Sequence, residues 1–284
     1  MPELPEAESI ARALDRVLPG RRITKVEIFS PAMRTPLAPL AAAGLPGHRF
    51  TAVRRRGRYV IAALDDGRGI LMHFGMSGVV RVEAAAVPKR KHEHLFLHLD
   101  NGMAFRFECP RRFSICEVHP LDDAGFPPCL DRLGVEPLDD CFDGNFLFAA
   151  SRGRKGCVKN FIMENAVVVG VGNIYSSESL FAARIDPRRP AGSLTRRECG
   201  RLAAAIREIL ARAIAAGGTT VSDFLNVDGS EGRFAQELAV YGRAGEPCPR
   251  CGEPIERCVL GGRSAFFCPV CCRTGKTHSH HPSK

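Results

Sequence analysis

"HLFLHLDNGMAFRF", residues 94–107, consists of two short apolar runs on either side of the turn-forming sequence Asp-Asn-Gly. Runs of this length, rich in aromatic or β-branched residues and bounded by Gly, Asp or Asn, are typical of antiparallel strands. The same pattern recurs between residues 22 and 120 in five further segments, ITKVEIF, RYVIAAL, GILMHF, VVRV and FSICEV. Residues 22–120 are therefore predicted to form an antiparallel sandwich or barrel.

A helix is predicted immediately before these strands, from about Glu3 to Leu18. Pro5 stands near its start, and a Pro-Gly pair at 19–20 marks its end. The apolar residues of this segment recur at the spacing of one helix face: Ile10, Leu14 and Val17. The segment is therefore expected to lie with its apolar face against the strands.

The chain becomes helical further on. Residues 121–150 are rich in turn formers and are interpreted as a connection between domains. Thr195-Arg-Arg-Glu198 is a capping-box pattern, which predicts the start of a helix, and Gly217-Gly218 predicts its end. The apolar face of this helix is expected to consist of Leu202, Ile206, Ile209, Leu210 and Ile214.

The chain is basic, with 40 Lys and Arg residues against 31 Asp and Glu residues and a formal net charge of +9. Such a balance favours polyanionic partners, because binding releases condensed counterions. No apolar run reaches membrane-spanning length, and the N-terminal "MPELPEAESI" carries three glutamates where a signal peptide is basic and then apolar. We therefore expect a cytoplasmic protein that does not contact membranes.

Four of the twelve cysteines have the spacing of a zinc site. They form a C-x2-C-x16-C-x2-C pattern, which suits tetrahedral Zn²⁺ bound by four thiolates: Cys248, Cys251, Cys268 and Cys271. The alternative is four unrelated thiols. The segment between the two pairs is expected to form a hairpin that turns at Gly261-Gly262 and presents Arg263. Cys258 and Cys272 are interpreted as spare thiols outside the site.

The N-terminus has two interpretations. If the initiator methionine is removed, Pro2 becomes a free secondary amine, and α-amino groups have a pKa of about 7.7–8.0, so a useful fraction is neutral at pH 7. The positive end of the helix dipole favours the neutral amine, whereas Glu3 and Glu6 favour the charged one. Pro2 is therefore a candidate nucleophile, and the alternative is that two prolines simply begin a helix beside glutamates.

Three other segments also remain open on residue patterns alone. The glycine-rich "GVGNIYSSESL", residues 170–180, suits either phosphate binding or chain reversal. The basic run at 54–58 is either an exposed binding face or a solvated edge that discourages aggregation. In "CPRRFSIC", residues 109–116, Phe113 is either part of an edge-strand patch or a wedge for a negatively charged partner.

Taken together, these segments resemble the formamidopyrimidine-DNA glycosylase and endonuclease VIII family of base-excision repair enzymes. The resemblance extends to about Cys271 and is carried in order by MPELPEAE, HFGMSG, PRRF, VVGVGNIYSSESLF, GGTTVSDF and the four cysteines. The stretch DGSEGRFAQELAVYGRAGEPC is similar to the formamidopyrimidine branch, in which a lesion-capping loop precedes the zinc finger.

The resemblance implies an α+β fold. It consists of an N-terminal antiparallel β-sandwich with a flanking helix and a C-terminal helix–two-turn–helix domain with a β-hairpin zinc finger, with DNA in the cleft between them. The implied organisation is a catalytic domain at 1–130, a linker at 131–150, a DNA-binding domain with the capping loop at 151–245, a zinc finger at 246–275 and a disordered tail at 276–284.

The resemblance also implies a role for each candidate residue. Pro2 would attack C1′ of the damaged nucleoside, Glu3 would supply acid/base chemistry at the sugar, and Glu6 would position the N-terminus. Met76, Arg111 and Phe113 would fill the void left by the extruded nucleotide, with Arg111 facing the orphaned base. Phosphates would be held by Arg58, Asn173 and Arg263, and one structural zinc by the four cysteines.

Two positions depart from the family pattern. Arg58 stands where the family usually has a lysine that contacts phosphate, so that a guanidinium fork replaces a point charge. Cys109 stands where an acid commonly precedes PRRF, which puts the placement of Arg111 in question.

The implied activity is that of a monomeric glycosylase and AP lyase that removes 8-oxoguanine and formamidopyrimidines from double-stranded DNA and nicks the abasic strand. The alternatives are an endonuclease VIII-like enzyme for oxidised pyrimidines and a non-catalytic protein that binds damaged DNA.

Overall fold

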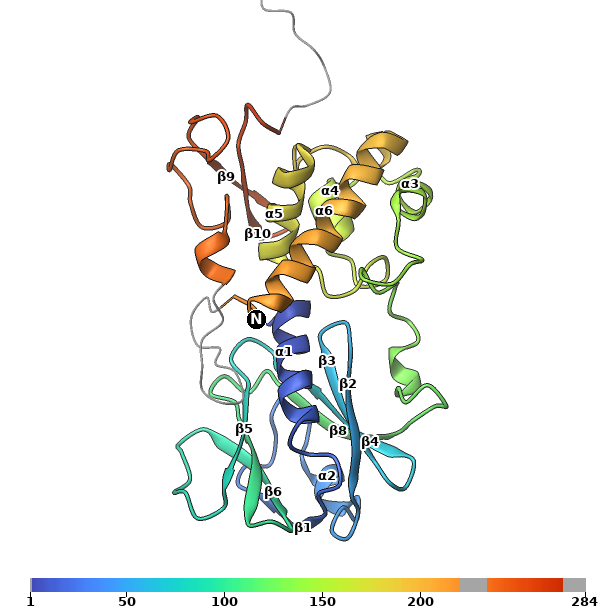
Figure 1. Ribbon diagram of the computed structural model, residues 1–284, viewed down its shortest axis with the longest axis vertical. Helices are drawn as coiled ribbons and strands as arrows, with labels where there is room; N and C mark the ends of the chain where they lie inside the picture. Colours follow the sequence, from blue (N-terminus) through green and yellow to red (C-terminus); the bar gives the residue numbers. More distant parts are fainter. Residues whose placement is uncertain (1, 220–233, 273–284) are drawn as a thin grey trace, which may run out of the picture. The chain divides into compact units, whose positions relative to one another are not determined.

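The computed structural model describes residues 2–219 and 234–272. The chain divides into two compact units, one formed by Met1–Gly134 and Ala211–Glu237 and the other by Val135–Leu210 and Leu238–Lys284 (Figure 1). None of the helices in the described part of the chain is both long and apolar enough to span a lipid bilayer.

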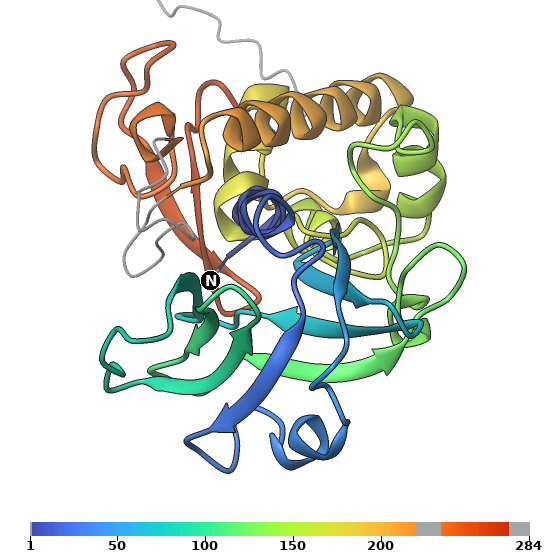
Figure 2. The same cartoon turned by 60° about the horizontal axis from the view of Figure 1, so that its bottom comes forward.

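The first unit contains two four-stranded antiparallel sheets (Figure 2). One has the order β1-β6-β7-β5, formed by Ile23–Ile28, Glu93–Leu99, Met103–Glu108 and Val79–Ala84. The other has the order β2-β3-β4-β8, formed by Phe50–Arg56, Tyr59–Leu64, Arg68–His73 and Ile115–Pro120. The predicted antiparallel sandwich is confirmed, and the barrel alternative is wrong because the strands belong to two separate sheets.

The quoted stretch 94–107 forms the central hairpin of the first sheet. Leu97 of β6 lies opposite Phe105 of β7, and Gly102 adopts a φ of 78° in the turn between them. Glycine adopts this left-handed conformation without steric cost, which explains why the turn ends with this residue. Leu97, Phe105 and Phe107 are almost fully buried and belong to one apolar core with Phe50 and Met72 of the second sheet.

Helix α1, Leu4–Asp15, joins this core through its apolar face. Ile10 and Leu14 are buried as predicted, but Val17 is 41% exposed. The helix ends at Asp15, so the helical spacing no longer applies to Val17, and the buried Leu18 packs into the core instead. Asp15 Oδ1 accepts a hydrogen bond from the Val53 backbone N–H of β2 at 2.7 Å, which fixes the end of the helix against the sheet.

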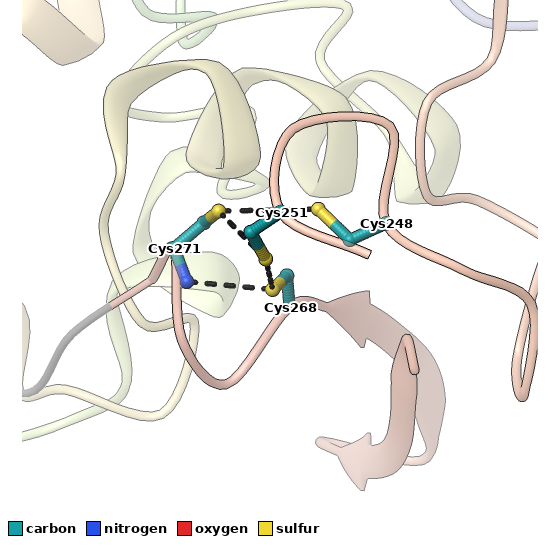
Figure 3. Close-up of side chains that lie close together, drawn as sticks. All are labelled: Cys248, Cys251, Cys268 and Cys271. Carbon is teal, nitrogen blue, oxygen red and sulfur yellow. Dashed lines mark hydrogen bonds between the residues drawn. The ribbon is translucent and has the colours of Figure 1, made fainter. Parts of the chain in front are cut away.

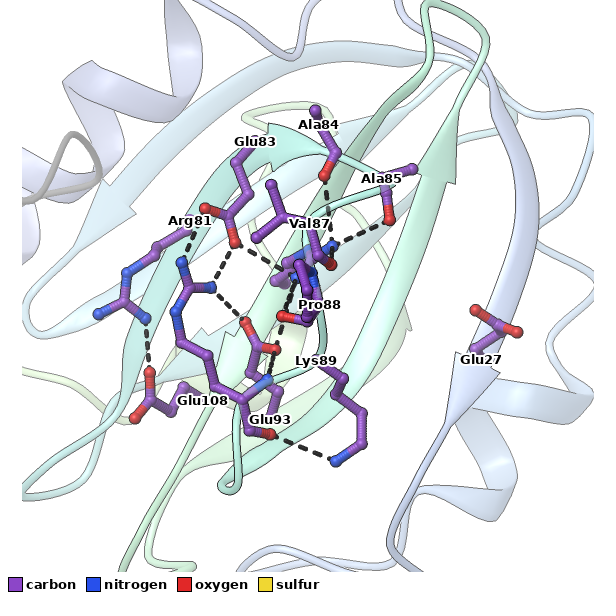
Figure 4. A network of polar contacts seen from close by, with 12 residues as sticks. Glu27, Arg81, Glu83, Ala84, Ala85, Val87, Pro88, Lys89, Glu93 and Glu108 are labelled. Atoms are coloured by element: carbon purple, nitrogen blue, oxygen red, sulfur yellow. Dashed lines mark hydrogen bonds and ion pairs between the residues drawn. The ribbon is translucent and has the colours of Figure 1, made fainter.

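A buried polar network holds the 85–90 loop against the first sheet (Figure 4). Arg106 of β7 is 1% exposed, and its Nη2 donates to the carbonyls of Val87 at 2.6 Å and Ala85 at 3.0 Å. Its Nη1 lies 3.6 Å from Glu93 Oε2. The same carboxylate oxygen accepts a hydrogen bond from the Arg90 backbone N–H at 2.6 Å. A buried cation needs such partners, since an uncompensated buried charge is strongly destabilising.

The main regular elements of the second unit, in its described residues, are four helices and one hairpin. The helices are α3 Gly144–Ser151, α4 Val158–Ile162, α5 Asn173–Ala183 and α6 Arg196–Ala215, and the hairpin pairs β9 Glu256–Leu260 with β10 Arg263–Phe267. Helix α6 starts at the predicted capping box, in which Thr195 N donates to Glu198 Oε2 at 2.8 Å and Glu198 N donates to Thr195 Oγ1 at 3.2 Å. The predicted α+β fold is confirmed.

The remaining elements are short. They are helix α2 at Ala38–Ala42 and three 3₁₀ turns at Pro128–Leu130, Ala191–Ser193 and Phe234–Glu237. The last residues of α6, up to Ala215, lie in the first unit, and the predicted stop follows at Gly217 and Gly218, which both have positive φ. Gly218 N donates to the Ala213 carbonyl at 2.8 Å, which closes the helix.

Candidate active site

The three predicted catalytic residues lie at the start of α1. Pro2 is buried, and Glu3 and Glu6 are 4% and 3% exposed. Glu3 has an extended backbone and occupies the N-cap position, and its N–H donates to Glu6 Oε2 at 2.8 Å. The Glu6 side chain therefore fixes the backbone one residue after the predicted nucleophile.

Thr219 completes the surroundings of Glu6 from the far end of the same unit. Its backbone N–H and its Oγ1 both donate to Glu6 Oε1, each at 2.8 Å. The preceding Gly218 has a φ of 86°, and a Cβ there would lie 3.1 Å from Glu6 Cγ, so both the conformation and the space favour glycine. Residue patterns did not single out Thr219, whose only signal is its place in the GGTTVSDF motif.

Replacing Glu6 with Gln is expected to slow the reaction that the resemblance implies at Pro2 while leaving the protein folded. Both carboxylate oxygens of Glu6 accept hydrogen bonds, but one end of an amide can only donate, so either Glu3 N–H or the Thr219 donors lose their acceptor. Loss of a hydrogen bond to a charged group costs about 1.5–3 kcal/mol, equivalent to a rate loss of roughly 10- to 150-fold if expressed at the reacting atoms. This loss is measured by comparing the single-turnover rates of the variant and the wild-type protein.

Glu8→Gln is the matched control on the same helix. Glu8 forms ion pairs with Arg55 and Arg12, each at 2.7 Å. The pair with Arg55 is partly buried, so the variant is expected to lower the melting temperature. It should nevertheless retain the wild-type rate within about threefold, because Glu6 and not Glu8 accepts the hydrogen bond from the Glu3 N–H. Equal rates for Glu6→Gln and Glu8→Gln would contradict a positioning role for Glu6.

The predicted void-filling residues lie on two adjacent turns of the first unit. Met76 follows β4 and is 46% exposed, and Phe113 precedes β8 and is 49% exposed. Exposed apolar side chains of this size are unusual enough to need an explanation when they gather in one place. The Arg111 guanidinium lies 5.3 Å from the centre of the Phe113 ring, so the structure brings the cation and the wedge together.

Arg58 and His73 form a second group in this unit. Arg58 follows Gly57 in the turn between β2 and β3 and is 8% exposed, so most of this cation is covered. Burial, together with the charges of Arg58 and Arg34, lowers the pKa of His73 to about 4, so its ring is neutral at pH 7. The Gly75 N–H donates to His73 Nδ1 at 3.2 Å, which leaves the proton on Nε2.

In the second unit, Asn173 is the first residue of α5. Its Oδ1 accepts from the Nζ of Lys159, and its Nδ2 lies 3.4 Å from the Tyr241 hydroxyl. Lys159 is fully buried. The predicted phosphate contact at Asn173 thus belongs to a cluster with Lys159 and Tyr241, neither of which residue patterns singled out because they are far apart in the sequence.

The four predicted zinc ligands are close together in this unit (Figure 3). Their sulfur atoms all lie within 4.8 Å of one another, with separations of 3.5 Å for Cys251–Cys268, 3.5 Å for Cys251–Cys271 and 3.9 Å for Cys248–Cys271. Four sulfurs about 2.3 Å from a tetrahedral ion lie about 3.8 Å apart. The donor set and its dimensions therefore fit one structural Zn²⁺.

Backbone groups orient the sulfurs, and the hairpin presents Arg263 as predicted. The Arg250 and Cys271 N–H groups point at Cys248 Sγ and Cys268 Sγ, at 3.4 and 3.3 Å. Arg263 is exposed at the first position of β10, after two glycines with positive φ at 261 and 262. Cys272 and Cys258 lie in the apolar cluster beside the site, but neither is among the four cysteines whose sulfurs lie within 4.8 Å of one another.

Two predicted segments lie partly or wholly outside the described residues. The stretch similar to the one with the lesion-capping loop, residues 228–248, begins within the undescribed 220–233, and the predicted disordered tail falls on 276–284. The structure therefore tests neither prediction.

Family models match most of the chain. Residues 1–116 match the formamidopyrimidine-DNA glycosylase N-terminal domain, residues 133–225 match the H2TH domain of the same enzymes, and residues 245–273 match a zinc finger found in FPG and IleRS. The three matches follow one another in the order that the sequence motifs predict.

Similar proteins match over nearly the whole chain. Formamidopyrimidine-DNA glycosylases of Stenotrophomonas maltophilia and Laribacter hongkongensis are each 49% identical, with 96% of this chain and 100% of each relative covered. Among solved structures, a single-residue mutant of Lactococcus lactis FPG in complex with a Fapy-dG containing DNA is 32% identical with a TM-score of 0.89, and the complex of Lactococcus lactis Fpg with an abasic site containing DNA is 32% identical with a TM-score of 0.88. Both solved structures also cover 96% of this chain over their full length.

Proposed function

Because the chain belongs to the formamidopyrimidine-DNA glycosylase family, we propose that it excises oxidised purines from double-stranded DNA in base-excision repair and then cleaves the abasic strand. The substrates would be 8-oxoguanine and formamidopyrimidines. The observation that carries the proposal is the N-terminal arrangement, in which Glu6 holds the backbone of Glu3 directly after Pro2. DNA binding alone does not need such an arrangement.

Pro2 is the proposed nucleophile once Met1 has been removed, because a proline nitrogen in a peptide bond has no available lone pair. The amine attacks C1′, the bond from C1′ to the base breaks, and the base leaves with a proton. Ring opening at O4′, assisted by Glu3 as general acid, gives an iminium between Pro2 N and C1′. The iminium accepts the electrons released when the C2′ proton is lost, and the 3′ phosphate then leaves by β-elimination. Loss of the C4′ proton into the resulting conjugated iminium expels the 5′ phosphate by δ-elimination.

Extrusion of the damaged nucleotide leaves a gap in the base stack that costs a few kcal/mol. The exposed Met76 and Phe113 are the proposed fillers, since large apolar side chains inserted between base steps replace lost stacking. Arg111 beside the Phe113 ring is proposed to donate to the orphaned cytosine, whose O2 and N3 accept hydrogen bonds. Cys109 stands where the family commonly has an acid, but the contact of Arg111 with the Phe113 ring supports this placement of Arg111.

Asn173 and Arg263 are the proposed phosphate contacts of the second unit. The exposed position of Arg263 at the turn of the hairpin and the dipole of α5 behind Asn173 both favour an anion. Zinc would be held by the four cysteines and would supply only structure there, because four thiolates leave no coordination position for chemistry. Arg58 is proposed as a further phosphate contact, and its low exposure restricts it to a phosphate that approaches closely.

The test is borohydride trapping of the full chain on a duplex with one 8-oxoguanine opposite cytosine, followed by peptide mapping of the adduct. We expect a DNA adduct on Pro2 and excision of 8-oxoguanine at least about tenfold faster than excision of 5-hydroxycytosine, a difference of about 1.4 kcal/mol in the barrier. Faster excision of the pyrimidine would favour an endonuclease VIII-like enzyme. Binding with no adduct on 8-oxoguanine or abasic duplexes would favour a non-catalytic protein.

A further inference from the structure

A buried hydroxyl connects the two turns that carry Met76 and Phe113. Ser114 is fully buried, and its Oγ donates to the Phe74 carbonyl at 2.9 Å. The same oxygen accepts a hydrogen bond from the thiol of Cys109, also at 2.9 Å. The thiol hydrogen of Cys109 thus points to Ser114, and the hydroxyl hydrogen of Ser114 points to the Phe74 carbonyl. These two hydrogen bonds connect the turn before β8 with the turn after β4.

Two glycines let the turns approach each other at backbone distance. A Cβ at Gly75 would lie 2.5 Å from the Phe113 carbonyl, and Gly75 has a φ of 58°. A Cβ at Gly78 would lie 2.3 Å from Ser114 Oγ and 2.5 Å from the Phe74 carbonyl. Since real Cβ contacts are longer than this, the Ser114 hydroxyl occupies a space that a side chain at residue 78 would fill, and the Phe113 backbone occupies one that a side chain at residue 75 would fill.

The segment that carries Phe113 is also fixed at its two ends. At one end, the Cys109 N–H donates to the His92 carbonyl at 2.9 Å, and His94 Nε2 lies 3.0 Å from the Cys109 carbonyl. At the other end, the Arg34 N–H donates to the Ser114 carbonyl at 2.9 Å. Between these anchors, Arg112 adopts a left-handed φ of 55°, so only the tip of the segment projects.

We propose that Ser114, assisted by Cys109, is a positioning residue that holds Met76 and Phe113 as one preformed unit for insertion into the base stack. This inference rests on the proposed function. Side chains that are already fixed in their bound arrangement lose little freedom on insertion, so insertion is faster than when two independent turns must be ordered on DNA. Ser114 does not touch the reacting atoms and acts through the Phe74 carbonyl and the thiol of Cys109.

The test follows insertion without requiring base excision. The full chain is mixed with a duplex that contains a tetrahydrofuran abasic analogue beside 2-aminopurine, whose fluorescence rises when Phe113 unstacks it. Ser114→Ala is expected to slow this rise by about tenfold, because it leaves both the Phe74 carbonyl and the Cys109 thiol without their partner. Cys109→Ser retains a hydrogen-bond donor, so its insertion rate should stay within about twofold of wild type. The insertion rate of Cys109→Ala should lie between those of wild type and Ser114→Ala.

Cys116→Ala separates positioning from general stability. Cys116 is fully buried in β8, and its loss opens a cavity of similar size in the same sandwich without removing a member of the Cys109–Ser114 chain. We expect it to lower the melting temperature at least as much as Ser114→Ala and to leave the insertion rate unchanged. The proposal would be overturned if Cys116→Ala slowed insertion as much as Ser114→Ala does. It would also be overturned if Ser114→Ala inserted at the wild-type rate.

The proposed function is assayed separately in the same preparations, by excision of 8-oxoguanine. If the wild-type protein unstacks 2-aminopurine but does not excise 8-oxoguanine, the result counts against the proposed enzyme and leaves the role of Ser114 intact. If the wild-type protein binds the tetrahydrofuran duplex and 2-aminopurine stays stacked, nothing is inserted and the role of Ser114 is overturned.

Discussion

Replacing Pro2 with Gly is expected to lower the rate of borohydride-trappable adduct formation on an abasic duplex by about a hundredfold or more. A secondary amine can only give a charged iminium, whereas the primary amine of glycine gives an imine that loses its proton and accepts electrons poorly. Glycine also lacks the pyrrolidine ring, which fixes the direction of the amine nitrogen, and misplacement of a reacting atom by about 1 Å can cost a hundredfold in rate. The affinity for a tetrahydrofuran duplex should change by less than about threefold.

Pro5→Ala is the matched control for this variant. Pro5 is a second buried proline in the first turn of α1, so its loss tests the helix start without touching the amine. Mass spectrometry must show that Met1 is absent from all three proteins, since a retained methionine would block the nitrogen. Turnover by Pro2→Gly equal to that of wild type and Pro5→Ala would remove Pro2 from the mechanism.

The sandwich was predictable because its signal is local. Strands β6 and β7 each bury most of their residues, and a turn with Gly102 at positive φ joins them, so residues 94–107 alone specify an antiparallel pair. Residue patterns alone left the choice between sandwich and barrel open, because it depends on which strands form the sheet edges, and only the family resemblance predicted the sandwich. Val17 shows the same limit, since helical spacing does not reveal that α1 stops at Asp15.

The candidate site was predictable only where a motif carries it. Pro2, Glu6 and the zinc cysteines stand in short recognisable patterns. Thr219 binds Glu6 from 213 residues away, and no local pattern reveals that contact. Arg106 is a similar case, since an arginine in a strand suggests a solvent-facing position, yet loop carbonyls and two glutamates allow it to be fully buried.

Cys268→Ser is expected to reduce bound zinc from one equivalent to nearly none and to weaken DNA binding by roughly tenfold or more. Cys268 is fully buried, directly follows β10 and is the first residue of the second cysteine pair, and a serine hydroxyl is a poor zinc ligand at neutral pH. Metal binding supplies folding free energy to such small sites, so its loss should unfold the hairpin that presents Arg263. Zinc release with a chromophoric chelator and a binding titration measure both effects.

Cys258→Ser is the control that decides whether the effect is due to the metal. Cys258 is a half-buried thiol in β9 of the same hairpin but lies outside the four-sulfur cluster, so its variant should keep one zinc and wild-type affinity. If Arg263 binds a phosphate, loss of the hairpin should also reduce the slope of log affinity against log salt by about one. Full affinity and an unchanged slope in zinc-free Cys268→Ser would show that the finger does not hold DNA. Weaker binding with an unchanged slope would instead show that the lost affinity does not come from a phosphate contact of Arg263. Loss of a phosphate contact always reduces the slope of log affinity against log salt.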